Sequence, residues 1–186
     1  MEYSMIWYIA GGLVILVVAG FIWGVLHLRQ SQRVASEAIA RVSLSDLAKL
    51  CVECQTVFAD SFNEQLSLDE LENSARILSA RLDSAESVKK AFAKPEFYWY
   101  FVLPVGAFLG QLICRHANGV WAEAEGGGLE VQIPVAGEPA VTYPFDKVIK
   151  QVTMGDKGDI YAYLMTAAKL EEAIGDSEEG GPGAPE

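Results

Sequence analysis

The amino end carries the longest apolar segment of the chain. Residues 3–28 contain no Asp, Glu, Lys or Arg, and a run of this length can cross a hydrocarbon core of about 30 Å as a helix. Trp7 and Trp23 lie near its two ends, where interfacial aromatic side chains collect. The pattern predicts a transmembrane helix over residues 5–28, preceded by a short tail over residues 1–4. A cleaved signal peptide is the alternative, but the basic start is missing and the run is too long.

Flanking charges predict the orientation of this helix. Glu2 is the one charged residue before it, whereas three arginines follow between residues 29 and 41. Positive residues stay on the cytoplasmic side, so we expect a single-pass protein with its soluble part in the cytoplasm. Gly20 and Gly24 have the spacing of a close-packed helix dimer and allow a homodimer, although glycine is common in membrane helices.

Helical spacing of apolar residues continues beyond the anchor. Residues 29–42 are rich in helix formers and predict a helical stalk. Ser43 with Asp46, and Ser67 with Glu70, have the form of capping boxes, and each precedes an apolar stripe. Two antiparallel helices, a helical hairpin, are therefore expected.

Residues 97–114 are uncharged and approach the length of a membrane span. Pro104 and Gln111 favour a different structure, an extended stretch that turns at the proline into a buried helix. A second span is the alternative. Gly106 and Gly110 are one turn apart and would let this helix approach a neighbouring element closely.

The pattern then changes to alternation, which predicts short strands. We expect strands at residues 120–125, 129–133 and 140–143, with a hairpin turn at Gly126–Gly128. Pro144 should start a helix that ends near residue 155, and a last helix should follow.

The predicted fold class is α+β. It combines the transmembrane helix, the helical hairpin, and a buried glycine-containing helix packed on a small antiparallel sheet with two C-terminal helices. The soluble domain spans residues 43–173, and its last helix starts at Asp159 and ends near Ala173. Residues 174–186 are rich in Gly, Pro and acids and predict a disordered tail.

Charge excludes one class of partner. The chain has 186 residues, 14 Lys+Arg and 25 Asp+Glu, and a formal net charge of −11. Six of the acids lie in residues 171–186, so the folded part is only mildly acidic. Phosphate recognition depends on clustered cations, and nucleic acid is therefore not an expected partner. Three cysteines cannot form a disulfide framework, which suits a reducing compartment.

Cys51, Cys54, Cys114 and His116 have the ligand types of a structural zinc site. Cys51 and Cys54, however, fall on the inward face of a predicted helix, where cysteine acts as a small buried hydrophobe. His116 is the one histidine outside the membrane border, and at a helix end it suits the helix dipole. We therefore predict no metal, no cofactor and no enzymatic activity. A zinc-dependent or thiol-based regulator is left as a further alternative.

Several short motifs resemble a small bacterial α+β module with the pattern LGxxLG, GxW and PFxKV. They cover about a third of the chain and comprise Gly106–Gly110 (GAFLG), Asn118–Trp121 (NGVW), Tyr143–Val148 (YPFDKV), Gly155, and Asp159 with Tyr161. Gln111 stands where the module usually has an acidic residue. The resemblance implies a non-enzymatic module of toxin systems and orphan proteins, whose glycine-containing helix packs on a sheet.

Together these features predict a bacterial inner-membrane protein that binds another protein. The leading hypothesis is an immunity protein that neutralises a cognate toxin of a type VI-like system, and the alternative is a scaffold or assembly factor of an envelope complex. Acidic side chains would attract a basic partner. The candidate partner-binding residues are Glu123, Glu125, Glu130 and, if exposed, Trp121, with Glu138 adding to the acidic surface. Core packing is the other role open to Trp121.

Overall fold

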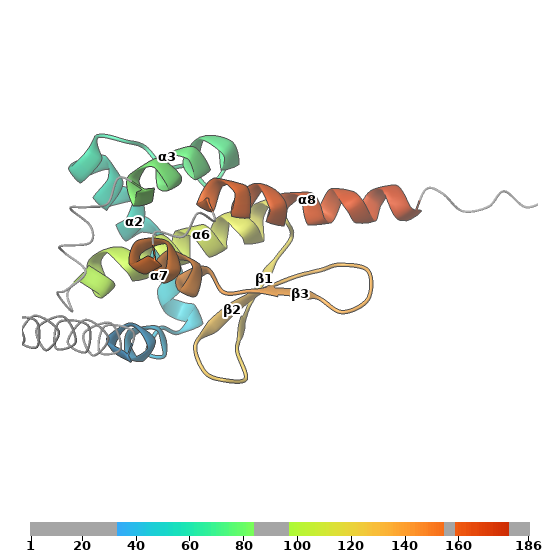
Figure 1. Cartoon of the computed structure of the whole chain (residues 1–186), viewed down its shortest axis with the longest axis horizontal. Coiled ribbons are helices and arrows are strands. Elements are labelled where there is room, and N and C mark those ends of the chain that lie inside the picture. Colours follow the sequence, from blue (N-terminus) through green and yellow to red (C-terminus); the bar gives the residue numbers. More distant parts are fainter. Residues whose placement is uncertain (1–32, 84–96, 155–158, 179–186) are drawn as a thin grey trace, which may run out of the picture. The chain divides into compact units, whose positions relative to one another are not determined.

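The computed structural model describes residues 33–83, 97–154 and 159–178 (Figure 1). The chain divides into two compact units, Met1–Ser36 and Glu37–Glu186, and the elements discussed below belong to the second. The predicted membrane helix, with Gly20 and Gly24, lies outside the described residues. Within the described ranges, no helix combines the length and the apolarity needed to cross a membrane.

The second unit is an α+β fold in which one central helix contacts three other α-helices and a three-stranded antiparallel sheet. The elements in chain order are η1 (Leu44–Asp46), α2 (Leu47–Phe62), α3 (Leu71–Asp83), η2 (Tyr98–Val102), α6 (Leu103–His116), β1 (Val120–Glu123), β2 (Leu129–Ile133), β3 (Ala140–Thr142), α7 (Pro144–Met154) and α8 (Ile160–Glu178).

Helix α6 is the centre of this unit. It contacts α2, α7 and α8 as well as strands β1 and β2, and Figure 1 shows it between α3 and the sheet. Its residues from Leu103 to Gly110 are all buried, which explains why this stretch is apolar around its whole circumference. The predicted buried helix is therefore confirmed. Asn118 follows the end of this helix in the left-handed conformation, with a φ of 49°.

The segment before α6 differs from the prediction. Residues 98–102 form a π-helical turn and not an extended stretch. Pro104 gives the physical reason, because it has no N–H to donate to the carbonyl of Tyr100 and its ring crowds that carbonyl. A wider π-helical turn accommodates both effects and keeps the chain helical.

The sheet has the order β1-β2-β3, and all neighbours are antiparallel. Its strands confirm the alternation seen in the sequence, although β1 ends at Glu123, two residues earlier than expected. Leu129, Val131 and Ile133 of β2 are buried. Gly127 and Gly128 have φ values of 86° and 87°, so the glycine-rich turn uses a backbone conformation that other residues rarely adopt.

Gly106 and Gly110 allow α6 to pack closely, as predicted. A Cβ at Gly110 would lie 2.1 Å from the Trp121 ring, and a Cβ at Gly106 would lie 2.4 Å from the Phe145 ring. The two rings also contact each other, with centroids 5.7 Å apart. The absence of two side chains on α6 thus makes room for two large aromatic side chains from β1 and α7.

The first capping box is confirmed and the second is not. The Ser43 N–H and hydroxyl both donate to the Asp46 carboxylate, at 2.9 and 2.7 Å. Around Ser67 the chain forms a turn, in which the Ser67 hydroxyl accepts from the N–H of Asp69, and α3 begins only at Leu71. A serine hydroxyl stabilises a local turn as readily as a helix start, and this ambiguity explains the error.

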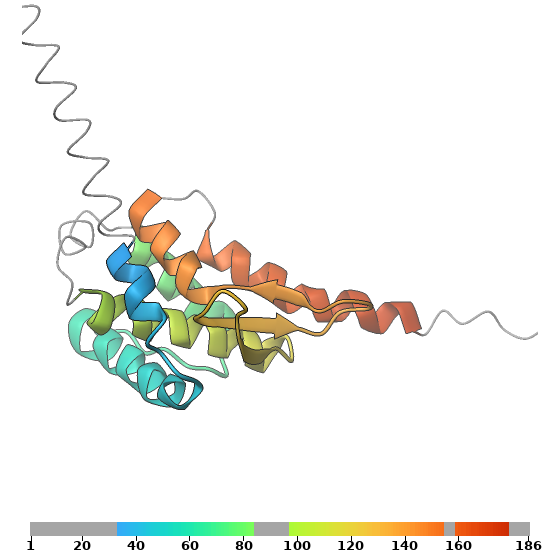
Figure 2. The same ribbon diagram turned by 90° about the horizontal axis from the view of Figure 1, so that it is seen from below.

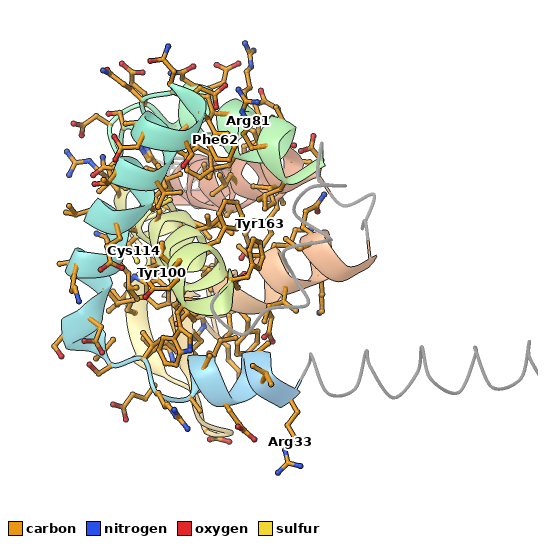
Figure 3. The ribbon with its side chains drawn as sticks, turned by 90° about the vertical axis from the view of Figure 1, so that its left-hand side faces the viewer. Arg33, Phe62, Arg81, Tyr100, Cys114 and Tyr163 are labelled. Atoms are coloured by element: carbon orange, nitrogen blue, oxygen red, sulfur yellow. The ribbon has the colours of Figure 1, made fainter. Side chains whose placement is uncertain are left out.

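The predicted helical hairpin is also corrected. Helix α2 packs mainly on α6, whereas α3 packs mainly on α8. The loop after α2 reaches α3 through Glu64, which accepts two hydrogen bonds from the Arg81 guanidinium at 3.0 and 2.7 Å. Arg81 lies over the Phe62 ring as well (Figure 3), 5.1 Å from its centroid.

The last helix is longer than the sequence suggested. Helix α8 continues to Glu178, five residues beyond the expected end at Ala173, so the first part of the predicted disordered tail is helical. Residues 179–186 lie outside the described part of the chain.

We predict that Gly110→Ala destabilises the protein, because the added methyl group must displace the Trp121 ring. Overpacking of this kind costs about 1–3 kcal/mol, partly offset by the better helix propensity of alanine. The urea midpoint of the full chain in detergent should fall. Gly126→Ala is the matched control, since nothing lies within 4 Å of its Cβ position. Equal midpoints for the two variants would contradict the packing described here.

Candidate protein-binding surface

The sheet has one face against α6 and one face turned away from it. Cross-strand pairing places Trp121, Val131 and Thr142 side by side on the α6 face. The neighbouring positions Val120, Gln132 and Val141 are therefore side by side on the opposite face, which we call the outer face. Figure 2 views the sheet from this side.

Two apolar side chains are exposed on the outer face. Val120 is 65% exposed and Val141 is 44% exposed, on the two strands that flank β2. A single exposed valine is unremarkable on a protein surface, but these two lie in one row across the sheet with only Gln132 between them. The row is a continuous strip of apolar and amide surface.

Tyr143 extends this strip beyond the end of β3. Its hydroxyl donates a hydrogen bond to the Glu130 carboxylate, and this bond with the nearby negative charge raises the pKa of Tyr143. The Gln132 side-chain N–H₂ group donates to the same carboxylate at 2.9 Å. Tyr143 is 48% exposed, so the bond orients a ring that remains available for contact.

A groove continues the surface around the free edge of β3. It lies between β3 and α8, has a volume of about 380 Å³, and is lined mainly by apolar atoms of Ile133, Val141, Ala162 and Ala167. The Thr142 hydroxyl and the Tyr163 hydroxyl are hydrogen-bonded across it. Strand β3 is an edge strand, and its outer backbone groups border this groove.

The candidate residues from the sequence do not form one patch. Glu123 and Glu125 are exposed at the β1–β2 hairpin, and Glu138 is exposed in the loop between β2 and β3. Glu130 is only 8% exposed, because it is held by Gln132 and Tyr143, so its assignment to an open acidic surface is wrong.

Trp121 is a packing residue and not an exposed hot spot. Its ring lies on the inner face, against Gly110 of α6 and Phe145 of α7. Its indole N–H is buried and has no hydrogen-bond partner among the described residues. An unmet N–H costs about 1–3 kcal/mol, which burial of a large ring can offset.

Sequence reasoning missed the exposed residues Val120, Val141 and Tyr143. The alternation of side chains along a strand was the one signal for their exposure, because a strand with Trp121 on the inner face must carry Val120 on the outer face. Which of the two faces is covered depends on where α6 packs, and this is a tertiary contact.

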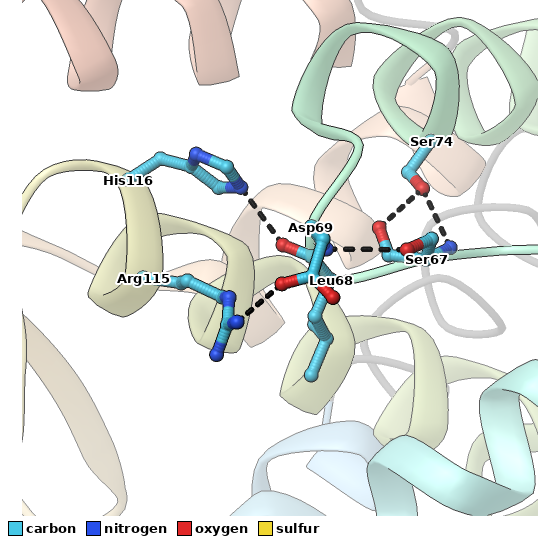
Figure 4. Close-up of polar contacts among 6 residues, drawn as sticks. All are labelled: Ser67, Leu68, Asp69, Ser74, Arg115 and His116. Atoms are coloured by element: carbon cyan, nitrogen blue, oxygen red, sulfur yellow. Dashed lines mark hydrogen bonds and ion pairs between the residues drawn. The ribbon is translucent and has the colours of Figure 1, made fainter.

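His116 and its neighbours hold the α2–α3 loop against the end of α6 (Figure 4). The His116 Nε2–H donates to the Leu68 carbonyl at 2.8 Å, and Arg115 forms an ion pair with Asp69. On the other side of the turn, the Ser67 N–H donates to the Ser74 hydroxyl at 2.9 Å. The histidine ring is thus engaged in a structural contact between helix and loop.

The three thiols lie in the packing between α2 and α6. Cys51 and Cys54 are buried, and Cys114, which is labelled in Figure 3, is half-buried. Burial raises the pKa of Cys51 and of Cys114 to about 11, and it raises the pKa of Cys54 further. Zinc requires thiolates, and within the described part of the chain no group of three or more His, Cys, Asp or Glu side chains is arranged around a common point.

Asp159 begins α8 and ties it to α3. Its carboxylate accepts from the N–H of Tyr161 at 2.8 Å and from the Ser79 hydroxyl. Asp159 therefore caps the start of α8. The hydrogen bond from the Ser79 hydroxyl joins α3 to the start of α8, so both side chains have a structural role.

Comparisons with protein-family models, with curated proteins and with solved structures find no match to the chain. The resemblance to the LGxxLG, GxW and PFxKV module stays a prediction from the motifs.

We predict that the native thiols react slowly with iodoacetamide. At pH 8, the rise in pKa of Cys51 from 9.0 to about 11 lowers its thiolate fraction about 100-fold. Mass spectrometry should show little alkylation of the native chain and full alkylation in urea. Val52→Cys, at a position on the same helix that is 61% exposed, supplies a fast-reacting control. Native Cys51 reacting as fast as this control would refute the assignment.

Proposed function

We propose that this protein is a membrane-anchored, non-enzymatic binding module that contacts a protein partner through the outer face. The observation that carries the proposal is the row of Val120, Gln132 and Val141, continued by the oriented ring of Tyr143. Exposed apolar strips bordered by polar side chains are typical of protein interaction sites.

The surface is suited to contact rather than to chemistry. A hydrogen bond to Glu130 restrains Tyr143 in advance, so less conformational entropy is lost when a partner covers the ring. Valine and tyrosine then supply apolar contact area, while Gln132 at the centre supplies an amide. The free edge of β3 offers backbone groups to which an extended segment of a partner can add.

Charge supports a basic partner. Glu123 at the end of β1, Glu125 in the β1–β2 turn and Glu138 in the β2–β3 loop are exposed, so the ends of the sheet carry negative charge. Such charges increase the association rate with a protein that has a cation-rich surface, and they repel proteins with acidic surfaces. This arrangement is consistent with an immunity protein that occludes a cognate toxin, and a scaffold of an envelope complex is the second candidate.

The anchor is supported by the sequence of residues 5–28, and the arginines that follow it favour a cytoplasmic position for the rest of the chain. Free, unbridged thiols suit that reducing compartment.

We predict that charge introduced on the outer face weakens binding of the partner. Val120→Lys with Val141→Lys should lower the affinity for the partner by at least about tenfold, because two desolvated lysines must enter the interface. Full-length protein bearing these changes is compared with wild type in a pull-down from membranes of its own cells, and the product of a neighbouring toxin gene is tested directly. Val52→Lys on α2 is the control for surface charge. Identical sets of captured proteins for wild type and the double variant would refute the outer face as the binding surface.

A second prediction concerns topology. A carboxyl-terminal alkaline phosphatase fusion should be inactive and a green fluorescent fusion bright, because the first needs an oxidising compartment and the second folds in the cytoplasm. The opposite result would place the binding unit across the membrane.

A further inference from the structure

A second surface, separate from the outer face, displays two aromatic rings. A cleft of about 390 Å³ lies between the start of α2 and the π-helical turn, and Arg41, Lys49, Glu53, Trp99 and Tyr100 contribute to its lining. Trp99 is 42% exposed and Tyr100 is 72% exposed. Tyr100 lies beside the start of α6 (Figure 3).

The π-helical turn that carries these two rings is packed against the core. The next residue, Phe101, is buried and stacks on Phe58 of α2 with centroids 6.2 Å apart. Phe97 also stacks on Phe101, with centroids 5.0 Å apart. Trp99 and Tyr100 are thus exposed on a turn whose next two residues, Phe101 and Val102, are fixed in the core.

The charges in the cleft are of both signs. Lys49 is exposed and forms a loose ion pair with Glu53 at 3.6 Å, and the exposed Arg41 also lines the cleft. Asp46 is occupied by the capping box, where the bonds from Ser43 hold its pKa below the usual range. A ligand that carries both a phosphate and an ammonium group can meet cations and aromatic rings at once.

The length of the chain before the cleft limits where this surface can be. Arg41 comes 13 residues after Leu28, the end of the predicted span. Thirteen residues reach at most about 45 Å when fully extended and about 20 Å as a helix. The cleft therefore cannot move far from the bilayer that holds the anchor, and Trp and Tyr are the side chains that settle at its interface.

We propose that the Trp99–Tyr100 cleft docks on the bilayer surface and takes a zwitterionic phospholipid headgroup. Arg41 and Lys49 bind the phosphate, while the rings face the ammonium group and the upper part of the acyl chains. The inference rests on the proposed membrane anchor. It places one surface of the unit on lipid and leaves the outer face for a protein.

The test measures quenching of tryptophan fluorescence by lipid. The full-length chain with Trp7→Phe and Trp23→Phe retains Trp99 and Trp121, and it is reconstituted in phosphatidylethanolamine–phosphatidylcholine vesicles. Some of these vesicles contain phosphatidylcholine brominated near the headgroup. We expect partial quenching, and we expect Trp99→Phe in the same background to remove it. The inward ring of Trp121 serves as the internal reference for a folded unit.

Each other outcome overturns the proposal in a recognisable way. An unquenched Trp99 in a chain that resists alkaline carbonate extraction refutes lipid docking and leaves the anchor intact. Release by carbonate refutes the anchor itself, and the docking with it. Quenching that persists after Trp99→Phe assigns the signal to another residue, and shielding of Trp99 that appears only with added cell extract assigns the cleft to a protein.

Discussion

The close contact of α6 with Trp121 and Phe145 is the constraint on which the rest of the folded unit depends. At Gly110 and Gly106 the two aromatic rings lie where a Cβ would otherwise stand, so a helix, a strand and a second helix meet at one place. The same helix contacts α2 and α8 on its other sides. Dispersion and apolar burial are largest where atoms approach this closely, which explains why the most buried helix of the described residues carries two glycines.

This contact also decides which face of the sheet is free. With Trp121 on the α6 face, the register requires Val120, Gln132 and Val141 on the other. A sheet covered on one side ordinarily carries polar residues on the open side. Glu130 and Gln132 follow that rule, whereas the two valines and Tyr143 depart from it. The departure is confined to one strip, which is the strip that we propose as the binding surface.

The groups that first suggest chemistry are used in packing. The thiols lie between α2 and α6, the His116 ring holds a loop, and the Asp159 carboxylate caps α8. Among the described residues, exposed apolar and aromatic side chains collect at two places, the outer face with its β3 groove and the Trp99–Tyr100 cleft. The two surfaces involve different residues, so the proposed lipid contact and the proposed protein contact do not compete for the same side chains.

The sequence by itself determined the local elements. The alternation of apolar and polar residues located the three strands. The glycine pair indicated the close approach of α6, and Ser43 with Asp46 indicated a helix start. Each of these features depends on residues that are neighbours in the sequence. Ser67 and Tyr98–Val102 were assigned wrongly, because a serine hydroxyl serves a turn as well as a helix start and a proline can follow a π-helical turn as well as an extended stretch. Only the tertiary structure decided that α2 and α3 pack on different helices, that Trp121 is inside, that Glu130 is held by Tyr143, and that Val120, Val141, Trp99 and Tyr100 stay exposed. These features depend on which apolar faces of the helices and the sheet pack together, and that packing is decided by contacts between residues far apart in the chain.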